Sequence, residues 1–351
     1  MKGVVLAAGQ GKRMQPISET LPKEIIPVLG RPFLFYILKR LHETKIREVI
    51  IVTAPWKEKT IKECFENDGA QLGLKLQYVI QREALGPAHA ILCARNLLRD
   101  QEYFLVQYGD SLAEGNIQKE TLERFPLEEH LDAFLTLRVV EDTKRYGMVR
   151  LRNDGFVAEV EEKPMETKEK LGVMGTFILN TEKYMSSVEQ EQFIQGRERF
   201  PADYVLRKQA PARVKGWVYA GSRIDLGTPL DVISAQRMLL KEQNASTVER
   251  TAHIHESAQV NAPVFIGRNA VIGPLSVISE YSSIGNNTII GQRTRIDASC
   301  IMDDCRVGDD CVIHNSVVVP KMQVKNKTCL SNAVLAEPPH PAVANSAGVS
   351  V

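Results

Sequence analysis

The first two thirds of the chain alternate between short apolar runs and segments whose apolar residues recur at helical spacing. Runs of this length bounded by glycines are typical of buried strands. We expect strands at 3–8, 48–53, 74–80 and 103–107, and helices at 33–42, 58–65 and 88–98. This βαβ series predicts an α/β fold, with a Rossmann-like, mostly parallel sheet covered by helices on both faces. Ligands bind beyond the carboxyl ends of the strands in such sheets.

The pattern changes near residue 244, where an aliphatic residue begins to recur at every sixth position. The repeat comprises Ile254, Val260, Ile266, Ile272, Ile278, Ile284, Ile290 and Ile296. After Asp297 the register slips by one, to Val307 and Ile313. A hexapeptide repeat predicts a left-handed parallel β-helix with three short faces in each coil, in which the aliphatic residue points inward and a following glycine permits the corner. About 85 residues give roughly four or five coils.

These patterns divide the chain into four segments. We expect a catalytic α/β domain at 1–243, a linker at 244–250, the β-helix at 251–335 and a loose tail at 336–351.

Composition excludes several functional classes. Lys and Arg number 44 against 43 Asp and Glu, a net charge of +1, so the chain has no global attraction for nucleic acid or an anionic membrane. The six cysteines form no Cys-x-x-Cys pair, which favours reduced thiols in a cytoplasmic protein. No apolar stretch approaches the ~18 residues of a membrane span, and the N-terminal run is too short for a signal peptide.

The first candidate motif is a glycine-rich turn after the first predicted strand. Leu6, Ala8, Gly9 and Gly11 lie where backbone N–H groups can approach phosphate oxygens and a base edge. Arg13 and Lys23 follow, and these cations could neutralise a triphosphate and a departing pyrophosphate. Met14 stands where a dinucleotide fingerprint needs a third glycine, which disfavours a nicotinamide enzyme. A bare Gly-x-Gly turn is weak evidence by itself, because a tight strand–loop turn has the same pattern.

The longer pattern is more specific. The strand, Gly9-x-Gly11-x-Arg13, then Pro22-Lys23 and Pro27-Val-Leu-Gly-Arg-Pro32, resembles the opening signature of the sugar-1-phosphate nucleotidylyltransferase family. The resemblance covers residues 1–240 and is nearest to glucose-1-phosphate thymidylyltransferases and uridylyltransferases, in their long form with a C-terminal left-handed β-helix. It implies a nucleotidyltransferase domain at 1–243.

A second motif, Gln81-Arg-Glu-Ala-Leu-Gly86, follows a predicted strand and opens a helix. An amide offers a donor and an acceptor, which suits the imide edge of uracil or thymine. In family members that use UTP or dTTP, a Gln before such a glycine reads the base. The resemblance therefore favours a pyrimidine triphosphate and leaves UTP and dTTP open. His89, further along, is expected to be a helix-face residue.

Two aspartates end later segments. Asp110 closes the strand at 103–107 and Asp225 stands in Arg223-Ile-Asp-Leu-Gly. Carboxylates at strand ends facing one site could hold Mg²⁺ against the α-phosphate. The family's metal ligands are aspartates at these two positions. Each alone would more simply be a cap or turn residue.

The remaining motif implies a sugar site. By the resemblance, Glu162 binds sugar hydroxyls, Lys163 binds the sugar phosphate, and Tyr146 and Gly147 line the ring. Gly175 matches the sugar-floor segment only loosely. Lys12, Ser111, Met174 and Arg223 depart from the family pattern, which puts the sugar in doubt more than the reaction.

The expected activity is therefore Mg²⁺-dependent transfer from dTTP or UTP to a sugar 1-phosphate, with glucose 1-phosphate favoured by family frequency. Arg13, Lys23 and Lys163 are the candidate catalytic cations, and a homo-oligomer with no nucleic-acid or membrane partner is expected. Three alternatives stay open: a catalytically silent regulatory subunit, a guanylyltransferase acting on mannose 1-phosphate, and a bifunctional enzyme with an acyltransferase site in the β-helix. The candidates for that second site are His253, His255 and His314.

Overall fold

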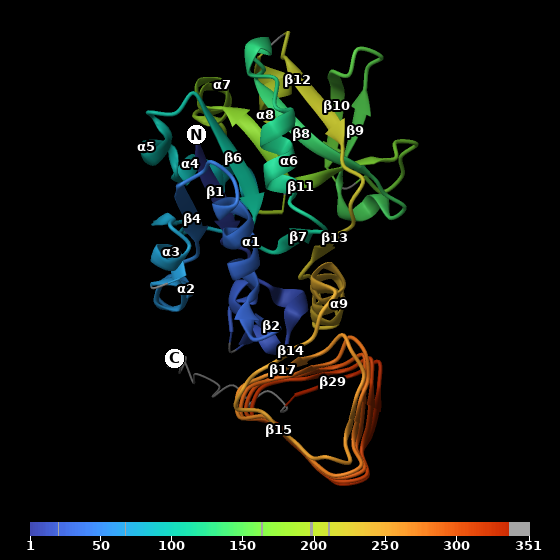
Figure 1. The fold of residues 1–351 in the computed structure, drawn as a ribbon. Helices are drawn as coiled ribbons and strands as arrows, with labels where there is room; N and C mark the ends of the chain where they lie inside the picture. The colour runs from blue at the N-terminus through green and yellow to red at the C-terminus, as the bar shows by residue number, and fades with distance from the viewer. Residues whose placement is uncertain (20, 67, 163, 197–198, 210, 337–351) are drawn as a thin grey trace, which may run out of the picture. The chain divides into compact units, whose positions relative to one another are not determined.

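The computed structural model describes residues 1–19, 21–66, 68–162, 164–196, 199–209 and 211–336. It consists of two compact units (Figure 1). The first comprises Met1–Lys12, Pro22–Pro27 and Arg31–Gly227, and the second comprises Arg13–Leu21, Val28–Gly30 and Thr228–Val351. The expected tail at 336–351 lies, apart from residue 336, outside the described residues, so it stays a prediction. Within the part that is described, no helix is long and apolar enough to cross a membrane.

The first unit is built on a nine-stranded sheet, in which β10-β9-β11-β6-β1-β4-β5 form a continuous path and β8 pairs with β11 and β12. Its strands are β1 (Lys2–Ala7), β4 (Glu48–Thr53), β5 (Lys75–Ile80), β6 (Tyr103–Tyr108), β8 (Ala133–Val139), β9 (Gly147–Leu151), β10 (Val157–Glu162), β11 (Leu171–Asn180) and β12 (Val214–Val218). The predicted strands β1, β4, β5 and β6 pair in parallel. The pairs that β11 forms with β6, β8 and β9 are antiparallel, so parallel order holds in the half built from βαβ crossovers.

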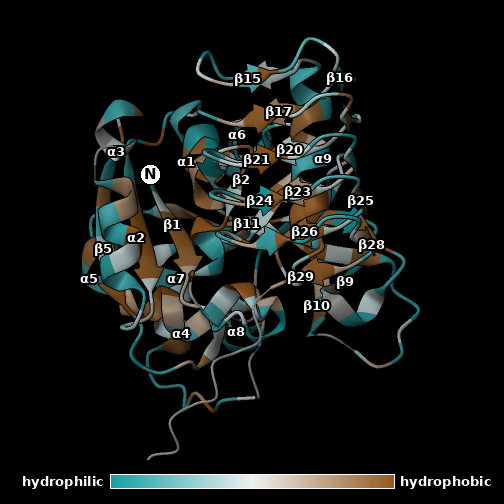
Figure 2. Ribbon diagram, turned by 90° about the horizontal axis from the view of Figure 1, so that it is seen from below, coloured by the Kyte–Doolittle hydropathy of each residue, from teal (hydrophilic) through white to brown (hydrophobic). Residues whose placement is uncertain are grey.

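The helices of the first unit are α1 (Phe33–His42), α2 (Glu58–Phe65), α3 (Asp68–Gln71), α4 (Gly86–Cys93), α5 (Arg95–Leu98), α6 (Ile117–Arg124), α7 (Thr181–Val188) and α8 (Pro201–Lys208). The helix expected at 88–98 is divided at Ala94 into α4 and α5. Short strands complete the unit: β3 (Arg31–Pro32), β7 (Ser111–Ala113) and β13 (Arg223–Asp225), and β2 (Pro27–Val28) has one residue in each unit. The sheet buries its apolar side chains, among them Val4, Phe104, Leu135 and Phe177, and the strands appear largely brown in Figure 2.

The second unit contains the predicted β-helix, whose coils stack as a triangular prism (Figure 1). One face is β14 (Thr247–Val248), β17 (Phe265–Ile266), β20 (Ser283–Ile284), β23 (Cys300–Ile301), β26 (Val317–Val318) and β29 (Val334–Leu335). The second is β15 (His253–Ile254), β18 (Val271–Ile272), β21 (Ile289–Ile290), β24 (Arg306–Val307) and β27 (Gln323–Val324). The third is β16 (Gln259–Val260), β19 (Val277–Ile278), β22 (Arg295–Asp297), β25 (Val312–His314) and β28 (Cys329–Ser331). Both parts of the predicted fold class are thus confirmed.

From Ile266 onward the aliphatic ladder of the prism follows the predicted register. Ile254, which was also expected to point inward, is exposed, because it lies on β15 at the end of its face. Ile266 stacks on Ile284, and Ile284 stacks on Ile301, all buried. Equivalent positions lie 18 residues apart in the early coils, as in the Asn269–Asn287 hydrogen bond, and 17 apart later, as in Asn287–Asp304. The one-residue slip after Asp297 is therefore a shortened coil.

The glycines of the repeat were expected to permit the corners of the coils, but the structure gives a different reason for their presence. The corner residues with positive φ are non-glycines such as Asn269 and Arg293, so the glycines do not supply the left-handed conformation. A Cβ at Gly285 would instead lie 2.5 Å from the backbone nitrogen of Asp303 in the next coil. Glycine is required because successive coils approach too closely for a side chain.

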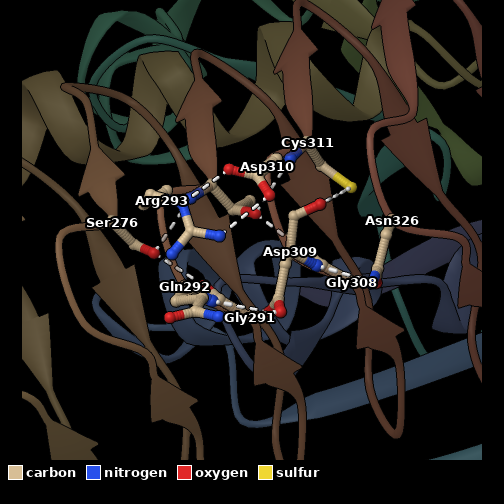
Figure 3. A network of polar contacts seen from close by, with 10 residues as sticks. Ser276, Gly291, Gln292, Arg293, Gly308, Asp309, Asp310, Cys311 and Asn326 are labelled. Carbon is tan, nitrogen blue, oxygen red and sulfur yellow. Dashed lines mark hydrogen bonds and ion pairs between the residues drawn. The ribbon is translucent and has the colours of Figure 1, made fainter.

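Polar side chains join the coils at the corners (Figure 3). Asp310 accepts hydrogen bonds from Nε and Nη2 of Arg293 at 2.7 and 2.9 Å, and Asp309 accepts one from Nε2 of Gln292 at 3.1 Å. Oδ1 of Asp309 also accepts from the backbone N–H of Gln292 at 3.0 Å. Side chains and backbone at this corner of one coil are thus hydrogen-bonded to the same corner of the next coil.

The helix α9 (Asp231–Gln243), expected to end the α/β domain, groups with the second unit. Nε2 of Gln236 donates to the carbonyls of Tyr281 and Ser299 at 2.7 and 3.1 Å, and its Oε1 accepts from Ser283 at 2.7 Å. The segment 244–250, expected as a linker, carries β14, which pairs with β17 and so begins the first face of the prism.

Candidate active site

The glycine-rich turn follows β1, as its sequence indicates. Leu6 pairs with Tyr108 of β6, and its carbonyl accepts a hydrogen bond from Gly109 at 2.9 Å. Ala8 is buried, and Gly11 has a φ of +67°, a conformation that favours glycine. Carboxyl ends of parallel strands therefore meet beside this turn.

A buried ion pair supports the turn. Nζ of Lys57 donates to both carboxylate oxygens of Glu24, at 2.8 and 2.9 Å, and to the carbonyl of Gly9 at 2.9 Å. Burial raises the pKa of Glu24 and lowers the pKa of Lys57, because both charges are withdrawn from water. The three N–H donors of Lys57 are matched by three acceptors, so both charges are satisfied without solvent.

Lys23 immediately precedes Glu24 in the chain and contacts Asp110, which stands just beyond β6. A Cβ at Gly9 would lie 3.5 Å from Nζ of Lys23, so this ammonium lies against the glycine turn. Burial alone would raise the pKa of Asp110, but the charge and hydrogen bond of Lys23 hold it below its ordinary value. Asp110 is therefore a carboxylate at neutral pH.

Asp225 lies next to Asp110 because β13 pairs with β7 in antiparallel register. Asp225 is opposite Ser111, and the N–H of Leu226 donates to the carbonyl of Asp110 at 2.8 Å. Nε of Arg223 donates to Oδ1 of Asp225 at 2.7 Å. The structure thus brings together the two predicted metal ligands, each paired with a cation of the chain.

These two carboxylates fit a divalent cation. Lys23 contacts Oδ2 of Asp110 and Arg223 contacts Oδ1 of Asp225, and among the described residues no side-chain partner is seen for the other oxygen of either carboxylate. The described residues contain no cluster of three or more His, Cys, Asp or Glu side chains that could hold a metal. Two carboxylates with open oxygens suit an ion that takes its remaining ligands from phosphates and water, as Mg²⁺ does.

The predicted sugar residues lie on the antiparallel half of the sheet. Glu162, at the end of β10, pairs with Gly147 at the start of β9. A Cβ at Gly147 would lie 3.1 Å from Oε2 of Glu162, so the glycine leaves room for that carboxylate. Tyr146 precedes Gly147, and its ring lies 5.3 Å from the guanidinium carbon of Arg223.

Packing between β11 and β6 is sufficient to explain a glycine at position 175. A Cβ at this position would lie 2.9 Å from Cβ of Tyr108, so a larger residue in β11 would collide with β6. Its predicted sugar contact stays a prediction.

Gln81 is held by its own loop. The side chain is buried, and its Nε2 lies 3.0 Å from the carbonyl of Gly86 and 3.1 Å from Nδ1 of His89. Burial lowers the pKa of His89, which favours a neutral imidazole, and Nδ1 accepts from Gln81 in the tautomer that carries its proton on Nε2. Both amide donors are thus engaged, and Oε1 is the atom left to face a base.

The geometry of the described site does not test two of the predicted catalytic cations. Arg13 is exposed in the 3-10 helix η1 (Lys12–Met14) and is grouped with the second unit. Lys163 lies outside the described residues. The roles of both stay predictions.

Sequence reasoning missed the pairing of Lys57 with Glu24 and treated Arg223 only as a departure from a pattern. Glu24 directly follows Lys23 and could have been noticed there. Nothing in the sequence indicates its partner, which is 33 residues away.

Comparison with known proteins agrees with the geometry. A family model described as "Nucleotidyl transferase" matches residues 2–242, and one described as "EIF2B subunit epsilon LbH domain" matches residues 243–338. The low-salt glycan biosynthesis nucleotidyltransferase of Haloferax volcanii is 26% identical over 244 residues, which are 70% of this chain and 67% of that protein.

The glucose-1-phosphate thymidylyltransferase of Streptomyces griseus is 28% identical over 241 residues, 69% of this chain and 66% of that protein. The bifunctional protein GlmU of Methanococcus maripaludis is 28% identical over 243 residues, 69% of this chain and 55% of that protein. The match thus spans 55–67% of the length of these relatives.

A crystal structure from Bacillus anthracis, assigned as a glucose-1-phosphate thymidylyltransferase in complex with sucrose, shares the fold with a TM-score of 0.61. It is 24% identical and covers 71% of this chain and 98% of its own. The family model covers more than half of the chain and includes the strand-end aspartates, the glycine turn and Lys23. The chain therefore belongs to the nucleotidyl transferase family.

Proposed function

We propose that the protein transfers a nucleotidyl group from a nucleoside triphosphate to a sugar 1-phosphate and releases pyrophosphate. The observation that carries the proposal is the meeting of Asp110 and Asp225 beside the glycine turn, with Lys23 in contact with Asp110. Triphosphate oxygens need both cations and backbone N–H groups, and this edge of the sheet offers both.

The reaction is an in-line displacement. An oxygen of the sugar phosphate forms a bond to the α-phosphorus, and the bond from that phosphorus to the pyrophosphate oxygen breaks, with the electron pair leaving on pyrophosphate. The nucleophile is already an anion, so no general base is needed, and positioning and charge neutralisation supply the rate.

Each residue has a defined task in this scheme. Lys23 and Arg13 would neutralise the departing pyrophosphate, and Lys163 the incoming phosphate. Asp110 and Asp225 would hold Mg²⁺. Bound there, the ion would screen the phosphate charges that oppose attack.

The proposed choice of substrates rests on residues of the same site. Oε1 of Gln81 would accept the imide N–H of thymine or uracil, which favours dTTP or UTP over a purine triphosphate. Glu162 and Gly147 would contact the sugar, and glucose 1-phosphate is the proposed acceptor. The name of the Streptomyces griseus relative supports both choices.

The experiment is pyrophosphate release with Mg²⁺, in which four triphosphates are tested against a panel of sugar 1-phosphates. We expect release with dTTP or UTP that disappears in Asp110→Ala and persists in Asp154→Ala, a change in the exposed turn between β9 and β10. Release only with GTP would overturn the base assignment and favour the guanylyltransferase alternative. Silence with every pair would favour the regulatory-subunit alternative.

The acyltransferase alternative has less support. His255 bonds to Ser257 at 2.8 Å and His314 to Asp297 at 3.2 Å, both on the exposed surface of the prism. The coils keep a spacing of 17 or 18 residues across the described part of the prism, which leaves little room for a protruding catalytic loop. We propose that the prism serves assembly into a homo-oligomer, which light scattering coupled to size-exclusion chromatography tests.

A further inference from the structure

The guanidinium of Arg223 connects β13 with β11 and with Tyr146, the residue that precedes β9. Its Nε and Nη2 each lie 2.7 Å from Oδ1 of Asp225, and its Nη1 donates to the carbonyl of Val173 at 3.0 Å. The ring of Tyr146 lies 5.3 Å from its guanidinium carbon. The side chain is only 9% exposed, so these contacts leave it little freedom to move.

The same guanidinium balances the charge of the site. Lys23 offsets Asp110 and Arg223 offsets Asp225, so the four groups carry no net charge. An arginine stays protonated at every ordinary pH, and its planar fork holds a carboxylate more rigidly than an ammonium does. A divalent cation approaching Asp225 therefore meets a fixed positive charge at the other carboxylate oxygen, which weakens its binding.

We propose that Arg223 is a positioning residue that holds Asp225 against the sugar floor and neutralises it, so that a divalent cation binds the two aspartates firmly only together with the triphosphate. The inference rests on the proposed metal-assisted function. The triphosphate adds several negative charges beside the two aspartates, and these outweigh the repulsion from Arg223. The enzyme alone would consequently bind the ion weakly.

The test is a titration of the full-length protein with Mn²⁺ alone, with free Mn²⁺ followed by electron paramagnetic resonance. Arg223→Gln removes the charge but keeps a donor for the carbonyl of Val173, and we expect it to bind Mn²⁺ about tenfold more tightly than the wild type, the effect of one neighbouring charge. Arg223→Lys keeps the charge and should bind Mn²⁺ like the wild type. The double variant Arg223→Gln/Asp225→Asn should lose the gain, which places the ion at Asp225.

If Arg223 only packed against its neighbours, its replacement would weaken Mn²⁺ binding. Tighter Mn²⁺ binding in Arg223→Gln therefore distinguishes the electrostatic role of Arg223 from a structural one. Arg223→Met provides a second neutral variant should Arg223→Gln fail to fold, as judged by thermal melting. Unchanged or weaker Mn²⁺ binding in the folded neutral variants overturns the inference. Pyrophosphate release by the wild type is measured in parallel: activity without the Mn²⁺ gain overturns only this inference, and the gain without activity overturns only the proposed function.

Discussion

Lys57 and Glu24 form an ion pair that is closed to solvent, with Nζ of Lys57 2.8 and 2.9 Å from the two carboxylate oxygens. The third N–H of the same ammonium holds the carbonyl of Gly9. Because Glu24 adjoins Lys23, the pair fixes the backbone on both sides of the proposed phosphate site. The free energy lost by removing two charges from water offsets much of the free energy gained from their attraction. The pair therefore contributes more to positioning the backbone than to the net stability of the fold.

Replacing only one member of this ion pair should strongly destabilise the fold. Lys57→Met leaves the carboxylate of Glu24 buried without a counter-charge, and we expect a loss of about 3–5 kcal/mol in the free energy of unfolding. Urea denaturation measures it. The matched control is Lys59→Met, two residues further along in α2, where an 88% exposed ammonium contributes less than about 1 kcal/mol.

In Lys57→Met/Glu24→Met both charges are gone, so most of the lost stability should return. Pyrophosphate release should stay low in this double variant, because the carbonyl of Gly9 still lacks its donor. Full activity in the double variant would contradict the positioning role of the pair.

The ion pair between Lys23 and Asp110 predicts a pH dependence. The pKa of Asp110 is lower in the folded protein than the ~3.9 of a free side chain, so its contribution to stability is present above that value and is lost as the pH falls through the folded pKa. Asp110→Asn should therefore cost stability at pH 7 and cost less near pH 3. Denaturation curves across this range provide the measurement, and a cost independent of pH would contradict the pairing.

Gly147 should affect sugar binding without affecting the fold. In Gly147→Ala the new Cβ would lie 3.1 Å from Oε2 of Glu162, so the carboxylate must move by a few tenths of an ångström. We expect the KM for the sugar 1-phosphate to rise by about three- to tenfold, consistent with one weakened hydrogen bond of ~1 kcal/mol, while the KM for the triphosphate stays unchanged. Steady-state kinetics separate the two, and equal increases in both would contradict the assignment of Glu162.

In the prism, glycine spacing should matter more than the corner ion pairs. Gly285→Ala places a Cβ 2.5 Å from the backbone of the next coil, and overpacking of this kind costs about 1–3 kcal/mol. Arg293→Ala removes a partly exposed ion pair with Asp310 and should cost less than about 1 kcal/mol. Thermal melting of the two variants tests whether Gly285→Ala lowers the melting temperature more than Arg293→Ala does. A larger decrease in Arg293→Ala would show that the corner ion pairs contribute more to stability than the close packing at the glycines.

Much of the architecture follows from periodicity, because period and burial are directly coupled. The six-residue repeat predicts which side chains of the prism point inward, and Ile266, Ile284 and Ile296 do so. The positions of Asp110 and Asp225 at strand ends likewise indicate that they belong to a binding site, because the carboxyl ends of parallel strands lie at one edge of a sheet. These inferences need only local pattern and a known topology.

What the sequence did not predict depends on contacts between distant segments. Lys57 reads as a surface residue after a strand, yet its ammonium is buried, because Glu24 and the carbonyl of Gly9 arrive from other elements. Arg223 is polar where an aromatic residue was expected, and only the fold shows that Asp225 and Val173 hold it. The place of α9 beside the prism depends on Gln236, whose spacing carries no periodic signal.

The central claim is that Asp110 and Asp225 form one site for nucleotidyl transfer. The most direct measurement is pyrophosphate release that depends on a sugar 1-phosphate, compared for the wild type, Asp225→Asn and the surface control Asp154→Asn. The account predicts at least a hundredfold loss in kcat for Asp225→Asn, on the order of the loss from removing one preorganised charge from a reaction site, with the control unchanged. Wild-type activity that persists in Asp225→Asn would contradict it.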